Sequence, residues 1–125
     1  MTDRKSPPLA VLIVDDDQLQ KLHTVAMVED AGFVALEADN ADQAVAILES
    51  RSDIALLLTD INMPGSMDGL KLAHAVGRRW PPIKIIVVSG QVRLSGYDLP
   101  TDSRFFAKPY QADTMISEIR SLTNR

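Results

Sequence analysis

Apolar residues gather in five short runs along the chain, and each run has the length of a β-strand. The first and third runs, LAVLIV and IALLLT, are continuously apolar, which is typical of strands covered by helices on both faces. The runs occupy residues 9–14, 33–38, 54–59, 83–88 and 104–107. They predict a sheet of five strands.

Between these runs, apolar residues return every three or four positions, which indicates amphipathic helices. The pattern is clear before the second run, after Asn40, after Asp68 and over residues 112–122. Asn40, with Gln43 three positions later, and Asp68 have side chains that cap helix N-termini. We expect Asp17 to cap the first helix in the same way.

The alternation of strands and helices predicts an α/β fold in which right-handed crossovers join parallel strands. Of the two common doubly wound orders, the flavodoxin-like order 2-1-3-4-5 suits a five-stranded domain. The fourth helix should be short or irregular, because residues 90–104 contain Gly96 and Pro100 and lack an apolar period. Residues 1–8 are predicted to be a disordered lead and residues 9–125 one domain.

Composition narrows the class of protein. The chain has 125 residues, of which 46% are hydrophobic and 24% charged, as expected of one globular domain. The apolar runs are too short to span a membrane, and the N-terminus has no signal-peptide core, so we expect a cytoplasmic protein without membrane contact. The absence of cysteine excludes thiolate chemistry, and the net charge of −4 argues against direct nucleic-acid contact.

Polar residues directly follow four of the five apolar runs. They are Asp15, Asp16, Asp17, Asp60, Ser89 and the pair Lys108-Pro109. The C-terminal ends of parallel strands meet at one edge of a sheet, where ligands bind. We therefore expect these residues to form one polar site, although they are far apart in the chain.

The expected site has the groups needed for metal-assisted phosphoryl transfer. Asp60 is the candidate nucleophile, because a carboxylate can attack phosphorus and form an acyl phosphate. Asp15 and Asp16 would supply hard oxygen ligands to Mg²⁺, with Mn²⁺ as a substitute. The ammonium of Lys108 would pair with Asp60, and the Ser89 hydroxyl would donate a hydrogen bond to the phosphoryl group. The Lys108-Pro109 bond is a candidate cis peptide that would aim the lysine inward.

The ordered segments resemble one known family. VLIVDDD, TDINMPGSMDG, IIVVSG and FFAKPY follow one another as in the receiver domains of bacterial two-component response regulators. The resemblance runs from Leu9 to Leu122. It implies that a sensor histidine kinase or a phosphotransfer protein passes a phosphoryl group to Asp60 with Mg²⁺ present. It also implies a downstream protein partner, which the sequence does not identify.

The resemblance assigns roles to further residues. It implies that the backbone carbonyl of Asn62 is a metal ligand, that Ser89 is the switch hydroxyl and that Phe105 is the switch aromatic residue. Two features depart from the usual family pattern. Residues 65–67 lengthen the loop after the acceptor by one position, and the segment between Ser89 and Lys108 is shorter than usual.

Three functions remain open from the sequence. The first is a signalling switch, and we expect a stand-alone receiver, although a fragment of a larger regulator would look the same. Its only expected chemistry is its own phosphorylation and dephosphorylation, so we do not expect an enzyme. The second is an aspartate-nucleophile phosphohydrolase, although Asn62 stands where that reaction needs a general acid. The third is a pseudo-receiver that binds a partner without phosphorylation, although no acceptor, metal ligand or lysine is missing.

Overall fold

The computed structural model describes residues 8–61, 68–90 and 99–124, which form a parallel sheet covered by helices. The strands are β1 (Ala10–Val14), β2 (Val34–Ala38), β3 (Ile54–Asp60), β4 (Lys84–Ser89) and β5 (Arg104–Ala107). The helices are α1 (Gln18–Asp30), α2 (Ala41–Ser50), α3 (Gly69–Arg79) and α4 (Ala112–Thr123). The strand order is β2-β1-β3-β4-β5 and every pair is parallel, which confirms the predicted flavodoxin-like order.

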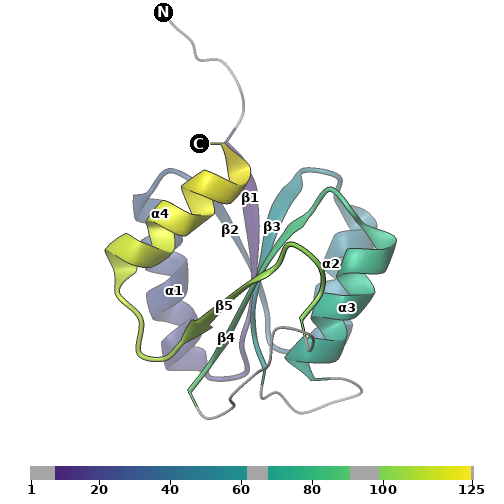
Figure 1. The fold of residues 1–125 in the computed structure, drawn as a ribbon, viewed down its shortest axis with the longest axis horizontal. Helices are drawn as coiled ribbons and strands as arrows, with labels where there is room; N and C mark the ends of the chain where they lie inside the picture. Colours follow the sequence, from purple (N-terminus) through teal and green to yellow (C-terminus); the bar gives the residue numbers. More distant parts are fainter. Residues whose placement is uncertain (1–7, 62–67, 91–98, 125) are drawn as a thin grey trace, which may run out of the picture.

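Helices cover both faces of the sheet, with α1 and α4 on one face and α2 and α3 on the other (Figure 1). The apolar runs are continuous because alternate residues of a central strand enter different cores. In β1, Leu12 and Val14 pack with residues of α2 and α3, whereas Val11 and Ile13 pack with residues of α1 and α4. Each fully buried side chain of this size contributes about 1.5–3 kcal/mol to the stability of the fold.

Polar side chains begin three of the helices, as the sequence predicts. Asp17 caps α1, Asn40 caps α2 and Asp68 caps α3. In each case a side-chain oxygen accepts a hydrogen bond from a backbone N–H two or three positions later, and so satisfies a donor that the helix itself leaves unpaired. The cap of α1 places the start of that helix immediately after the first strand end.

The parallel register brings the C-terminal ends of the central strands to one edge. Asp60 is paired with Val88 and Ser89 with Ala107, and β1 lies beside β3 in the same direction. Beyond β5, the N–H of Lys108 donates a hydrogen bond to the Ser89 carbonyl at 2.9 Å. The polar residues that follow the strands therefore lie at the same end of the sheet.

Three expectations concern residues outside the described ranges. The disordered lead, the longer loop after β3 and most of the short or irregular fourth helix fall at residues 1–7, 62–67 and 91–98. From residue 99 the chain enters β5 through a turn. There the Ser103 N–H donates a hydrogen bond to the Pro100 carbonyl at 3.2 Å.

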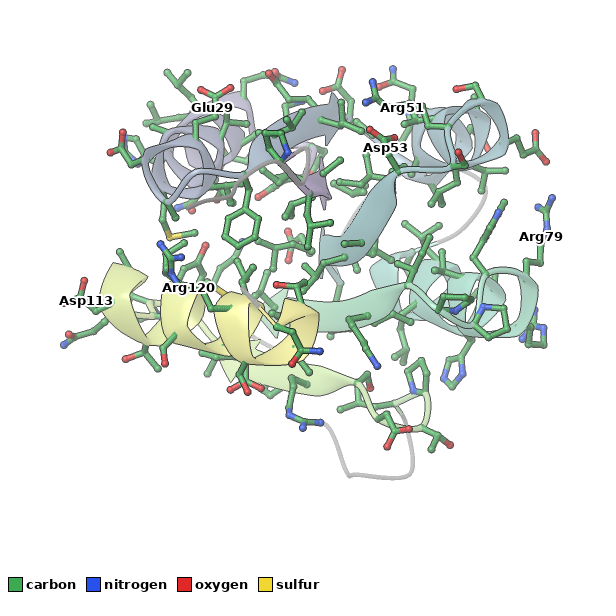
Figure 2. The ribbon with its side chains drawn as sticks, turned by 90° about the horizontal axis from the view of Figure 1, so that it is seen from above. Glu29, Arg51, Asp53, Arg79, Asp113 and Arg120 are labelled. Atoms are coloured by element: carbon green, nitrogen blue, oxygen red, sulfur yellow. The ribbon has the colours of Figure 1, made fainter. Side chains whose placement is uncertain are left out.

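Arg120 links α4 to the C-terminal end of α1. Its guanidinium donates a hydrogen bond to the Ala31 carbonyl at 3.0 Å and lies 5.8 Å from the centre of the Phe33 ring. Figure 2, in which the molecule is seen from above, shows Arg120 between the two helices. This contact lies at the opposite end of α1 from the cap Asp17, so α1 is held at both ends.

Candidate functional site

Three carboxylates meet at the polar edge of the sheet. Oxygen atoms of Asp15, Asp16 and Asp60 lie within 4.8 Å of one another. Asp15 and Asp60 are buried, with 6% and 9% of their surface exposed, whereas Asp16 faces solvent. Burial removes water that would stabilise these charges, so the cluster favours a bound cation. Carboxylate oxygens are the ligands that hard divalent cations prefer, and the donor set therefore fits the metal implied by the sequence.

Lys108 places an ammonium group against the cluster. Its Nζ lies 3.6 Å from Oδ2 of Asp60 and 3.8 Å from Oδ2 of Asp15. The peptide bond between Lys108 and Pro109 is cis, as expected from the sequence. One ammonium against three carboxylates leaves the site negatively charged, so an anionic phosphoryl group needs a further cation to approach it.

Burial raises the pKa of the Asp15 carboxyl above its usual value of 3.8, because the charged form loses its hydration. The N–H of Asp17, which donates to Oδ1 of Asp15 at 2.9 Å, and the ammonium of Lys108 oppose this rise in pKa. The carboxylates of Asp60 and Asp16 raise the pKa further. A bound cation would therefore relieve an unfavourable charge on Asp15.

The two candidate switch residues lie on neighbouring strands. Ser89 ends β4 and is only 1% exposed. Phe105 is half-buried in β5 and packs against the core on the side of α2 and α3. Asn62, the candidate ligand through its backbone carbonyl, lies outside the described residues.

Two further features of the site are not evident from the sequence pattern. Gly69, the first residue of α3, lies so close to β3 that a Cβ there would overlap the Asp60 carbonyl oxygen and stand 2.9 Å from the Cα of Ile61. The second feature is an ion pair between Lys21 and Asp39, in which the lysine is only 3% exposed. The glycine after the cap Asp68 does not indicate which element approaches it, and the ion pair joins residues of separate elements, so neither feature has a local signal.

Comparison with known proteins decides the family. The family model of the response regulator receiver domain matches residues 11–120. The chain belongs to this family. It is 30% identical over 115 residues to the response regulator receiver protein CpdR of Brucella abortus (strain 2308), covering 90% of this chain and 94% of CpdR. It is also 26% identical over 119 residues to the sensor kinase CckA of the same strain, covering 92% of this chain but 12% of the kinase.

Solved structures agree with the receiver assignment. The CheY-like response regulator receiver domain protein of Methanospirillum hungatei JF-1 has a TM-score of 0.85 at 27% identity, covering 94% of both chains. The chain is thus a receiver domain of two-component systems, a family that acts in signalling rather than in catalysis. Within the part of the chain that the structure describes, no helix has the length and apolar character needed to cross a membrane.

Proposed function

We propose that this receiver domain is a phosphorylation switch in which Asp60 accepts a phosphoryl group from a sensor histidine kinase or a phosphotransfer protein. The observation that carries the proposal is the meeting of three carboxylates and the Lys108 ammonium at one strand edge, in a chain of the receiver family. Asp60 suits the acceptor role because it ends β3 and its carboxylate lies beside the ammonium.

The transfer step changes two bonds. A bond forms between a carboxylate oxygen of Asp60 and phosphorus, while the bond between phosphorus and the donor's imidazole nitrogen breaks. The electron pair of the broken bond stays on that nitrogen, and the donor leaves as neutral imidazole because its second ring nitrogen carries a proton. The ammonium of Lys108 is then available to pair with an oxygen of the acyl phosphate.

The three carboxylates are the proposed metal ligands. Asp15, Asp16 and Asp60 would hold Mg²⁺, and Mn²⁺ can substitute because it accepts the same oxygen donors. When bound, the cation supplies the positive charge that lets an anionic phosphoryl group approach the cluster. The family resemblance adds the backbone carbonyl of Asn62 to the ligand set.

Ser89 and Phe105 are proposed to report the modification. The Ser89 hydroxyl at the end of β4 would donate a hydrogen bond to a phosphoryl oxygen. Movement of Ser89 toward Asp60 would leave space into which the half-buried Phe105 ring can turn. Phosphorylation would thus favour the conformation with the ring turned inward, which changes the surface around β5. Because Phe105 has no hydroxyl, it signals to a downstream protein through packing alone.

An apolar surface on α1 supports a protein as the phosphodonor. Leu19 and Leu22 lie three positions apart and are 64% and 62% exposed. The helix begins two residues after Asp16, so Leu19 lies three positions along the chain from the acidic cluster. Adjacent exposed side chains of this size are typical of protein contacts.

Intact-mass measurement after incubation with acetyl phosphate and Mg²⁺ tests the proposal. We expect a gain of one phosphoryl group that is absent in Asp60→Asn and retained in Asp113→Asn, which removes an exposed carboxylate at the start of α4 (Figure 2). No adduct with any donor would contradict the switch and favour a pseudo-receiver. Sustained turnover of unrelated phosphate esters would instead favour a phosphohydrolase.

A further inference from the structure

Asp39, the residue directly after β2, bonds to α1 through its carboxylate. Its Oδ1 accepts hydrogen bonds from the ammonium of Lys21 and from Nε2 of Gln18, the latter at 3.0 Å. Lys21 is 3% exposed, whereas the side chain of Asp39 is 45% exposed. Lysine is almost never so deeply buried unless it is paired, so this ion pair holds α1 against the turn after β2.

The backbone around Asp39 contacts α2 and the acidic cluster. The Asp39 N–H donates to Oε1 of Gln43 at 2.8 Å, and the next residue, Asn40, caps α2. On the other side, the Ala38 carbonyl accepts a hydrogen bond from the Asp15 N–H at 3.1 Å. The end of β2, directly before Asp39, therefore holds the backbone of Asp15, a candidate metal ligand.

The first turn of α1 continues this network to the carboxylates. Gln18 and Lys21, which bond to Asp39, lie in the part of the helix that Asp17 caps. The N–H of Asp17 donates in turn to Oδ1 of Asp15 at 2.9 Å. Hydrogen bonds thus lead from α2 through Asp39 to the start of α1, and from there to the acidic cluster.

We propose that Asp39 and Lys21 are positioning residues for the metal site. The pair holds the start of α1 so that Asp15 and Asp16, in the loop before it, keep the spacing that a divalent cation requires. This inference rests on the proposed Mg²⁺ site and does not depend on phosphoryl transfer. Neither residue has to touch the cation, because supporting partners of metal ligands change affinity about 10- to 100-fold when they are removed.

Charge alone leads to a different expectation. Through space, loss of the negative Asp39 weakens Mg²⁺ binding and loss of the positive Lys21 strengthens it. Positioning weakens Mg²⁺ binding in both cases, because either loss breaks the same ion pair. The direction of change on removing Lys21 therefore separates the two explanations.

Calorimetric titration of Mg²⁺ into Asp39→Asn, Lys21→Met and the double variant tests the pair. We expect each single variant to raise the Kd about tenfold, and the double variant to raise it no further, because both changes act through one contact. Lys21→Arg keeps a cation that can pair with Asp39 and should raise the Kd less than Lys21→Met does. The matched control is Glu37→Gln, which removes an exposed charge from β2 and should also stay within about twofold.

Amide hydrogen exchange at the start of α1 provides a second test that needs no metal. The N–H groups of Leu19 and Gln20, which Asp17 caps, should exchange faster in Asp39→Asn than in the wild type. If Asp39→Asn does not fold because Lys21 is left buried and unpaired, the double variant still provides both readings.

Two results would overturn the positioning role. One is tighter Mg²⁺ binding by Lys21→Met; the other is an unchanged Kd in both single variants with only a lower Tm, which indicates a purely structural pair. Wild-type protein that binds no Mg²⁺ would overturn the metal site itself and this inference with it. Normal Mg²⁺ binding without phosphoryl uptake would overturn the proposed switch and leave the positioning role intact.

Discussion

Neutralising Asp15 should make the metal-free receiver domain more stable, although the change removes a candidate metal ligand. Asp15→Asn keeps the size of the side chain, and its Oδ1 can still accept the Asp17 N–H that lies 2.9 Å away in the wild type. The substitution removes an ionised carboxylate whose pKa is raised mainly by burial. The folded protein therefore loses an unfavourable charge without losing a hydrogen bond.

The distances in the cluster set the size of this gain. Two like charges 4.8 Å apart, the outer limit in the cluster, repel by about 3.5 kcal/mol at an effective dielectric constant of about 20. Asp15 has two such neighbours, of which Asp16 is exposed and partly screened. The Lys108 ammonium at 3.8 Å attracts the Asp15 carboxylate by about 4.4 kcal/mol under the same conditions. Without screening, these three interactions leave a net repulsion of about 2.6 kcal/mol, and the screening of Asp16 lowers it. Asp15→Asn removes this repulsion together with the cost of burying a charged carboxylate, which is the larger cause of the raised pKa.

Thermal unfolding in the presence of a chelator measures the difference. At neutral pH we expect the Tm of Asp15→Asn to exceed that of the wild type by roughly 4 °C per kcal/mol. Folding raises the pKa of Asp15, so at low pH the carboxyl is protonated in both the folded and the unfolded wild type and costs no stability. As the pH rises through the folded-state pKa, the buried carboxyl ionises and the wild type loses stability. The difference in Tm should therefore shrink as the pH falls toward 3.8, the usual pKa of this group.

Magnesium should reduce or reverse the difference in stability between Asp15→Asn and the wild type. A cation present at ten times its Kd stabilises the wild type by about 1.4 kcal/mol, and the variant with one ligand fewer gains less. Asp113→Asn, which removes an exposed carboxylate, should show neither effect. A metal-free Asp15→Asn protein that is no more stable than the wild type at neutral pH would refute the reasoning from charge repulsion.

Three further substitutions, the first paired with a control in the same helix, test separate parts of the site. Gly69→Ala should destabilise the fold by about 3 kcal/mol or more, because its Cβ would overlap the Asp60 carbonyl. Gly77→Ala in the same helix is the control: a Cβ there has neighbours only at 3.5 and 3.8 Å, so this substitution should stabilise the fold by up to about 1 kcal/mol. Urea unfolding measures the stability of both variants. Lys108→Met should strengthen Mg²⁺ binding in calorimetry, because it removes a positive charge 3.6 Å from Asp60, and should slow phosphoryl uptake; weaker Mg²⁺ binding would contradict this. Ser89→Ala should still gain a phosphoryl group in the mass measurement but lose most of the phosphorylation-dependent chemical-shift changes in β5; unchanged shifts relative to the phosphorylated wild type would exclude a switch role.

Local signals were sufficient for the strands, the helix starts and the position of the acidic cluster. The continuous apolar runs of β1 and β3 follow from burial on both faces, and the caps Asp17, Asn40 and Asp68 satisfy helix donors two or three positions away. Parallel strands all end at the same edge of a sheet. That rule brings Asp15 and Asp60 together from the order of elements alone, without knowledge of their distance.

By itself, the sequence determined which chemical groups stand at the polar edge, because strand ends and helix caps are properties of neighbouring positions in the chain. Only the tertiary structure decided which groups lose water and how closely the elements approach. Lys21 is 3% exposed although a lysine on a helix is normally solvated, and its partner Asp39 belongs to a different element. Gly69 has to lack a side chain because α3 lies directly against the backbone of Asp60. Burial and close approach depend on pairs of residues that the fold brings together, so no local pattern contains them.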